Sequence, residues 1–148
     1  MKTSALIFVV FSLCSTYQVL AGSGKAIIPN FSANSATDGK CVYYMSNITP
    51  HDLEVSITFY DQNGTVITSG IVYTNFINSN TEIAAGSTGV VVINPTPWKY
   101  GYAVIEWNNK STDDDVLGLV AHGFFDQQDG SDNAEAYYSI PINCGAAF

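Results

Sequence analysis

The clearest pattern of hydrophobic and polar positions lies in residues 53–67, which read LEVSITFYDQNGTVI. Apolar residues occupy every second position from Leu53 to Phe59, polar side chains stand between them, and Tyr60 continues the outward-facing series. This period of two predicts a β-strand with one buried face. The following residues 61–64 contain an Asn-Gly pair, which favours a tight turn with positive φ angles, and residues 65–67 begin a predicted return strand.

Short apolar or alternating segments, separated by turn residues, continue along the rest of the chain. Further strands are predicted at 42–45, 71–73, 89–93, 101–107, 116–125 and 136–142. The segment 116–125 is apolar on both faces and is therefore expected to be a central strand. Because no segment after residue 21 has a helical period, the pattern predicts an all-β fold. We expect a single antiparallel β-sandwich of about seven to nine strands, with a partly closed barrel as the alternative.

The first 21 residues have the three-part layout of a secretory signal peptide. Lys2 precedes the apolar run 5–13, and Val19-Leu20-Ala21 ends with a small residue suited to cleavage. The apolar run is shorter than the roughly 20 residues needed to cross a bilayer. A membrane anchor and a buried helix are the alternatives. Residues 22–40 are rich in Gly, Ser, Ala and Asn, which predicts an irregular arm with a short edge strand ahead of a sandwich domain at 41–148.

Charge narrows the choice of partners. Cleavage after residue 21 would leave four lysines, no arginine and thirteen acidic residues, a net charge of −9. Nucleic-acid binding needs cationic side chains, and arginine above all for reading bases, so nucleic acid is excluded as a partner. The same acidity disfavours an anionic membrane surface. We expect an exported protein, secreted, extracellular or periplasmic, with no membrane insertion once the signal is removed.

Two cysteines, Cys41 and Cys144, remain after the predicted cleavage, one near the start of the first strong strand and one after the last. An even pair in an exported chain predicts a disulfide. Closing a loop of about 100 residues would stabilise the fold by about 4–5 kcal/mol in the chain-entropy model. Metal ligation is the alternative, but the pair lacks a Cys-x-x-Cys spacing.

Several motifs resemble a known class of domains: IIPNF, CVYYMSNIT, VSITFYDQNGTVI and, near the end, YSIPIN. They are similar to a loosely defined class of exported bacterial immunoglobulin-like β-sandwich domains of unassigned function. The resemblance covers most of residues 27–143. It implies an immunoglobulin-like sandwich and a bacterial origin, and it implies no activity and no site residue.

No catalytic pattern is present in the sequence. A Gly-x-Ser-x-Gly elbow is absent, and only two histidines occur, His51 in a predicted exposed turn and His122 at a predicted interior or rim position. Glu54, Glu106 and Glu135 are the candidates for a glycosidase pair, but the sequence gives no separation between them. We therefore expect no enzyme activity and no cofactor.

Two acidic segments are weak candidates for calcium ligands: residues 113–115, and Asp126, Asp129 and Asp132. Calcium prefers such oxygen ligands, but neither segment has the order of an EF-hand loop. Each is better interpreted as a solvated acidic loop, so no metal is predicted.

The remaining candidates are aromatic. Trp98 and Tyr100 lie in a segment leaving a strand, where exposed rings could stack on a sugar, whereas Trp107 shares a face with apolar residues and is predicted to be core. The favoured prediction is an exported non-catalytic protein with a structural, adhesive or surface-recognition role, whose partner is a protein or glycan at a cell surface or matrix. Self-association of the 22–40 arm by strand addition, through Ile27, Ile28 and Phe31, is a further hypothesis. The alternative is a small carbohydrate-binding module that uses Trp98 and Tyr100.

Overall fold

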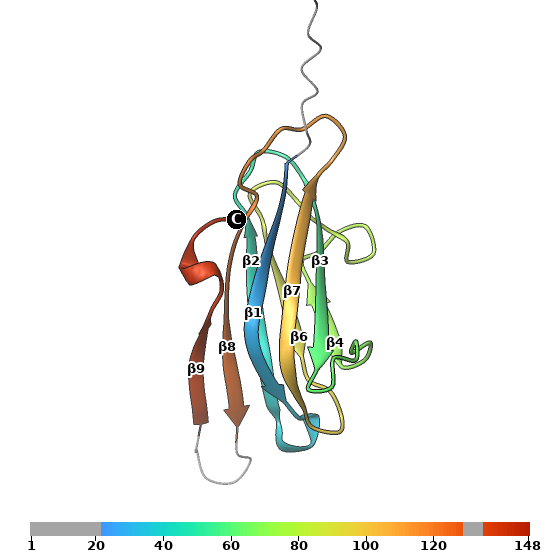
Figure 1. The fold of residues 1–148 in the computed structure, drawn as a ribbon, viewed down its shortest axis with the longest axis vertical. Helices are drawn as coiled ribbons and strands as arrows, with labels where there is room; N and C mark the ends of the chain where they lie inside the picture. The colour runs from blue at the N-terminus through green and yellow to red at the C-terminus, as the bar shows by residue number, and fades with distance from the viewer. Residues whose placement is uncertain (1–21, 129–134) are drawn as a thin grey trace, which may run out of the picture.

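Nine β-strands form two antiparallel sheets in the computed structural model, which describes residues 22–128 and 135–148. Sheet A has the order β1 (Ser23–Ala33), β7 (Lys99–Asn109), β3 (Leu53–Asp61) and β5 (Glu82–Ile83). Sheet B has the order β4 (Ile71–Thr74), β6 (Thr88–Ile93), β2 (Gly39–Asn47), β8 (Leu119–Gln128) and β9 (Glu135–Pro141). The strands run along the long axis of the molecule, and β7 lies between β1 and β3 in the front layer (Figure 1). The all-β prediction is confirmed.

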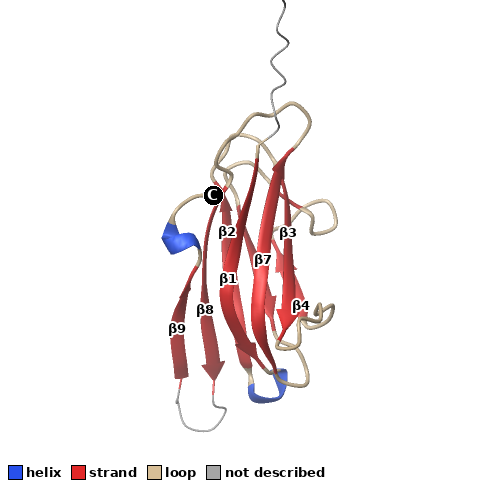
Figure 2. Cartoon of the chain, in the orientation of Figure 1, coloured by secondary structure: helices blue, strands red, loops and turns tan. Residues whose placement is uncertain are grey.

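The helical content of the described residues is limited to two short 3-10 turns, η1 (Ser35–Thr37) and η2 (Asn143–Gly145) (Figure 2). In this described part, no helix has the length and apolar character needed to cross a membrane. The two sheets enclose one hydrophobic core, to which β1, β2, β3, β6, β7 and β8 all contribute buried side chains. The arrangement is that of a β-sandwich.

The chain changes sheet at every connection from β1 to β8. An immunoglobulin-type sandwich keeps its first two strands side by side in one sheet. Here β1 and β2 lie in different sheets, and β1 pairs with β7. The observed order therefore departs from the predicted immunoglobulin-like order.

The strand predicted from the strongest alternation is β3. Its apolar positions are buried and the side chains between them are exposed or half-buried, as predicted. The turn follows at the expected place, where Gly64 has a φ of 77° and its N–H donates to the carbonyl of Asp61 at 2.8 Å. The predicted return strand is shorter than expected, because only Val66 bridges back, to Tyr60, before the chain crosses to sheet B.

Residues 22–40 differ from the irregular arm that the sequence predicts. They contain β1, an eleven-residue strand paired with β7, in which Ile28 and Phe31 are 0% and 1% exposed. One extra residue between Ile28 and Phe31 forms a bulge and shifts the register. The bulge breaks the period of two, so the buried positions do not alternate in the sequence. Only Ile27 of the apolar residues proposed for strand addition remains exposed.

Trp107 is fully buried, as predicted, and links the core to the end of the chain. Its Nε1–H donates to the backbone carbonyl of Phe148 at 2.7 Å. The backbone N–H groups of Gly118 and Leu119 donate to the same carbonyl, each at 3.0 Å. These three bonds hold the final residues against the first residue of β8.

The predicted Cys41–Cys144 disulfide is wrong, because both cysteines are free. Cys41 in β2 is level with Phe125 in β8, which is level with Tyr138 in β9. Two strand spacings, or about 10 Å, thus separate Cys41 from β9 even at this level. A disulfide requires Cα atoms within about 7 Å of each other. Cys144 is farther still, because β2 and β9 run in the same direction (Figure 1), and Cys41 lies near the start of β2 whereas Cys144 follows the end of β9.

A substitution at Gly123 tests the packing between β8 and β2. A Cβ at this position would lie 2.3 Å from the ring of Tyr43, which is fully buried. We expect Gly123→Ala to lower the free energy of unfolding by about 1–3 kcal/mol, the usual range for overpacking, in urea denaturation. Gly39→Ala is the matched control, since its Cβ would meet its nearest neighbour at 3.6 Å, an ordinary contact. Equal stabilities for the two variants would contradict this packing.

Thiol labelling of the native protein tests the position of the cysteines. Cys144 is exposed, whereas Cys41 is 0% exposed and burial raises the pKa of its thiol. Because the thiolate is the reactive form, we expect a maleimide to modify Cys144 in the native state and Cys41 only after unfolding. Peptide mass spectrometry identifies the labelled residue. If neither cysteine reacts with the maleimide until a reducing agent is added, the two are joined and the predicted disulfide is right after all.

Candidate functional site

Strand pairing decides which side chains share the outer face of sheet A. Along β7, the side chains at even positions from 100 to 108 point away from the core, because Ala103, Ile105 and Trp107 between them are buried. The rows of this face, read from β1 through β7 to β3, are Ser23–Asn108–Glu54, Lys25–Glu106–Ser56 and Ile27–Val104–Thr58, followed by the pairs Tyr102–Tyr60 and Ser32–Tyr100. The face therefore has a polar end and an aromatic end.

Four rings form the aromatic end, which we call the aromatic cluster: Tyr60, Trp98, Tyr100 and Tyr102. The rings of Trp98 and Tyr100 lie 4.9 Å apart at an angle of 32°, and those of Tyr60 and Tyr102 are stacked at 5.0 Å. Trp98, Tyr100 and Tyr102 are 55%, 45% and 42% exposed. A cluster of large exposed rings is uncommon on a protein surface, so this end of the face is the candidate binding surface.

The orientation of Trp98 is fixed by β1. Its Nε1–H donates to the hydroxyl oxygen of Ser32 at 2.9 Å, and Ser32 is the direct neighbour of Tyr100. The indole therefore has its one polar group satisfied by the protein, while more than half of its surface remains in contact with solvent. A ring held in this way loses little conformational freedom when a ligand stacks on it.

Asp61 joins the two strands that carry the cluster. Its Oδ1 accepts the backbone N–H groups of Asn63 and Thr65 at 2.9 and 3.0 Å, and its Oδ2 accepts the Nζ of Lys99 at 3.2 Å. The bond from Thr65, then that from Asn63, and the charge of Lys99 lower the pKa of the Asp61 carboxyl. One buried carboxylate thus ties the turn after Tyr60 to the start of β7.

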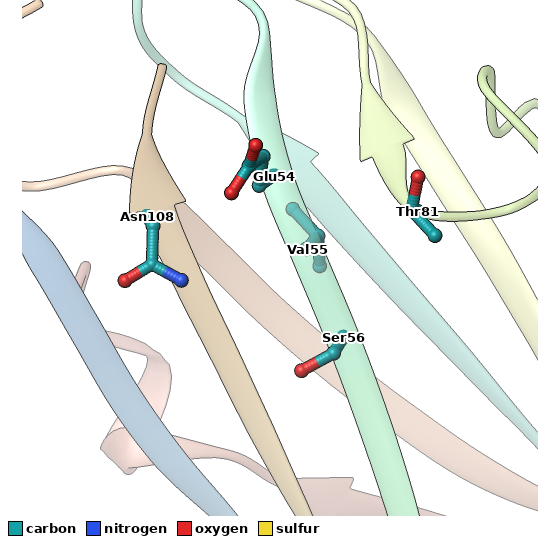
Figure 3. Close-up of a pocket in the computed structure, with 5 residues that line it drawn as sticks. All are labelled: Glu54, Val55, Ser56, Thr81 and Asn108. Atoms are coloured by element: carbon teal, nitrogen blue, oxygen red, sulfur yellow. The ribbon is translucent and has the colours of Figure 1, made fainter. Parts of the chain in front are cut away.

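The polar end of the face contains two shallow hollows. The first, of about 260 Å³, is lined by Glu54, Val55, Ser56, Thr81 and Asn108. In Figure 3, Glu54 and Ser56 come from β3, Asn108 from the neighbouring β7, and Thr81 from the chain that enters β5. These side chains offer a carboxylate, an amide and two hydroxyls at one open surface.

The second hollow, of about 480 Å³, adjoins the first, because Ser56 and Asn108 line both. It extends across β7 to β1, where Nζ of Lys25 lies 3.0 Å from Oε1 of Glu106. Glu54 and Glu106 are diagonal neighbours on this face, about 7–8 Å apart between Cα atoms in an antiparallel pair. They lie on an open surface, however, and the Glu106 carboxylate is held by Lys25.

Tyr137 and Tyr138, two further exposed aromatic residues, lie on a different surface. They are 54% and 42% exposed on β9, the edge strand of sheet B, and Tyr138 stacks on Phe125 at 4.9 Å. His122 differs from its predicted interior or rim position, because it is exposed on the outer face of sheet B, where it stacks on Tyr44 at 5.1 Å. Neither group contributes to the aromatic cluster on sheet A.

The acidic residues considered for calcium do not assemble into a site. Asp126 belongs to β8, and its Oδ2 lies 3.1 Å from Nζ of Lys40, while Asp129 and Asp132 lie outside the described residues. Asp115 instead pairs with His51, at 2.9 Å between Oδ2 and Nδ1. Within the described ranges, no group of three or more His, Cys, Asp or Glu side chains is placed to hold a metal ion.

Comparisons with family models, with curated proteins and with solved structures find no match to this chain. No ligand or activity is therefore carried over from a relative.

The sequence identified Trp98 and Tyr100 as candidates but missed the contribution of Tyr60. Alternation in β3 placed Tyr60 on the outer face, which was the available signal. Its contact with Tyr102 depends on the register between β3 and β7, and these strands are separated by more than 35 residues of chain.

The Asp61 carboxylate gives a pH-dependent test of the aromatic end. Because its pKa is lowered in the folded protein relative to about 3.9 in an unfolded chain, its contribution to stability is complete above that value. The contribution is lost as the pH falls through the folded-state pKa. We expect Asp61→Asn to unfold at a lower temperature than the unmodified protein at pH 7, and the difference to shrink below about pH 4.

Thermal melts followed by circular dichroism between pH 2 and 7 measure this difference. Asp114→Asn, which removes the same charge from an exposed position, is the control for net charge. A difference between the Asp61 variant and the unmodified protein that stays constant across this range would show that the carboxylate charge is not what holds the turn to β7.

Proposed function

We propose that this protein is an exported, non-catalytic recognition module that binds glycans on the outer face of sheet A. The observation that carries the proposal is the aromatic cluster, in which Trp98, Tyr100 and Tyr102 are each more than 40% exposed on one face of a sheet. Exposed rings on a rigid sheet offer a flat apolar surface with polar groups at the edge. The CH-rich face of a sugar ring matches that surface.

The chemistry around the cluster favours a sugar over an apolar ligand. The hydroxyl groups of the three tyrosines lie at the margin of the rings and can exchange hydrogen bonds with sugar hydroxyls. Lys99, the cation nearest the cluster in sequence, is already paired with Asp61. The chain as a whole has a net charge of −8, which disfavours an acidic polysaccharide.

Glycan recognition gives the adhesive role expected from the sequence a specific mechanism. A signal peptide at 1–21 would place the module outside the cytoplasm, secreted or periplasmic, where glycans of a bacterial surface or of its surroundings are the accessible partners. In this proposal the sandwich is the scaffold and the aromatic cluster is the adhesive surface. A protein partner, the other class expected from the sequence, has no comparable observation in its favour.

The two tryptophans make the proposal testable by fluorescence. Trp98 is 55% exposed and Trp107 is 0% exposed, so only Trp98 should respond to a ligand on the outer face. We expect a bound oligosaccharide to protect tryptophan emission from acrylamide quenching. Trp98→Ala should remove the response and weaken binding at least about tenfold, or about 1.4 kcal/mol.

A panel of neutral linear hexasaccharides, the cello-, xylo-, manno- and laminari-forms, supplies the ligands. Tyr137→Ala is the matched control, since it removes an exposed ring of similar accessibility from the other sheet. The proposal is wrong if no member of the panel binds, or if the Trp98 variant binds as tightly as the unmodified protein.

A further inference from the structure

We infer that the polar end of the sheet A face is a second subsite of the same binding surface, and that the ligand is a linear, uncharged polysaccharide lying along β7. This inference rests on the proposed function, because it takes the aromatic cluster as the first subsite. It adds the direction of the polysaccharide relative to β7, the minimum length of the polysaccharide and its charge. The residues that carry it are Glu54, Ser56 and Asn108, which line the hollows, and the Lys25–Glu106 pair.

The two subsites lie on one uninterrupted strand surface. Tyr100 and Asn108 are eight residues apart on β7, a distance of about 27 Å in an antiparallel strand. The row between the two ends is open to solvent, since Ile27 is 58% exposed beside Val104. No other described element covers the middle of the face. A single sugar ring spans only a small part of this distance, so only an extended chain reaches both ends.

The side chains at the polar end suit the hydroxyl groups of such a chain. Asn108 offers an amide donor and acceptor, Ser56 a hydroxyl, and Glu54 a carboxylate acceptor. The two large apolar residues that border the hollows, Val55 and Trp107, have their side chains buried on the opposite face of the sheet. The donors and acceptors that Glu54, Ser56 and Asn108 present match the hydroxyl groups of a polysaccharide.

Charge selects among polysaccharides. The ammonium of Lys25 lies 3.0 Å from Glu106, and that of Lys110, on which the charge of Glu54 also acts, lies 2.6 Å from Glu82. With Glu54 counted, carboxylates outnumber ammonium groups at this end. An acidic polysaccharide would bring carboxylates or sulfates to a surface with an excess of negative charge. An uncharged chain avoids this repulsion and still uses every polar group of the hollows.

One experiment separates the two subsites by varying the length of the oligosaccharide and the position of the substitution in the protein. Calorimetric titrations of the full chain compare the neutral hexasaccharide that binds best with its own disaccharide and trisaccharide. We expect the hexasaccharide to bind at least about tenfold more tightly than the disaccharide. Asn108→Ala should weaken the affinity for the hexasaccharide about fivefold, the scale of one or two hydrogen bonds. The affinity for the disaccharide should not change.

Two variants complete the design. Trp98→Ala should weaken the affinity for the short and the long ligands alike, because both bind to the aromatic cluster. Ser139→Ala, on an exposed position of β9 in sheet B, is the control and should bind both as the unmodified protein does. Thermal melts confirm that each variant remains folded, and all three substitutions lie at exposed positions.

The outcomes distinguish the inference from the function on which it rests. If Asn108→Ala binds the hexasaccharide normally while Trp98→Ala does not, the second subsite is wrong and the aromatic cluster stands. If the disaccharide and the hexasaccharide bind equally well, the extended ligand is wrong. If Trp98→Ala has no effect, or if no hexasaccharide binds, the proposed function fails and the second subsite fails with it.

Discussion

The register of β7 between β1 and β3 is the constraint on which the rest of this structure depends. Alternate residues of β7 point to opposite faces, so Ala103, Ile105 and Trp107 enter the core while the residues between them form the outer surface. Shifting a strand by one residue exchanges its two faces. Such a shift in β7 would expose Trp107 and bury Glu106, and both changes are costly. The exposed rings at one end of the strand and the polar hollows at the other are therefore fixed by the packing of the core.

Contacts at both ends of β7 reinforce this register. At the aromatic end, Asp61 binds Lys99 and its own turn, and Ser32 binds Trp98. At the opposite end, Trp107 donates to the carbonyl of Phe148 from inside the core. The bulge in β1 lies beside Tyr102 and absorbs the mismatch between the two strands without disturbing the pairing on either side. A face built on a strand held in this way is preorganised, which would reduce the entropy lost when a ligand of the proposed kind binds there.

Local features of this fold could be predicted from the sequence, and features that depend on strand pairing could not. The buried face of β3 and the burial of Trp107 follow from alternation alone. The bulge between Ile28 and Phe31 removes that alternation from β1, so a strand with two fully buried residues looks irregular. The position of His122 required knowledge of which face of β8 meets the core, and an apolar segment gives no such information.

The cysteines and the aromatic cluster both depend on strand pairing, which the sequence does not give. The two cysteines were predicted to meet and do not, whereas two of the rings meet without a prediction. Cys41 and Cys144 both lie near strand ends, but whether two ends meet depends on the direction of each strand and on the strand between them. Tyr60 and Tyr102 are far apart in the chain, and only the β3–β7 register brings their rings together. The sequence named half of the candidate site, Trp98 and Tyr100, because those two are neighbours in the chain. Tyr60 and Tyr102 join the site only because β3 pairs with β7.

The exposure of these rings also bears on how copies of the chain could associate. An exposed sheet face next to the free edge of β1 is a surface on which copies of a chain can associate. Lys25 and Pro29 lie on that edge strand, and a bulge follows Ile28; each of these features discourages another strand from pairing there. The net negative charge adds repulsion between copies. The edge is thus protected while the face beside it stays open, which is the arrangement expected where the ligand approaches from above the sheet and does not extend it.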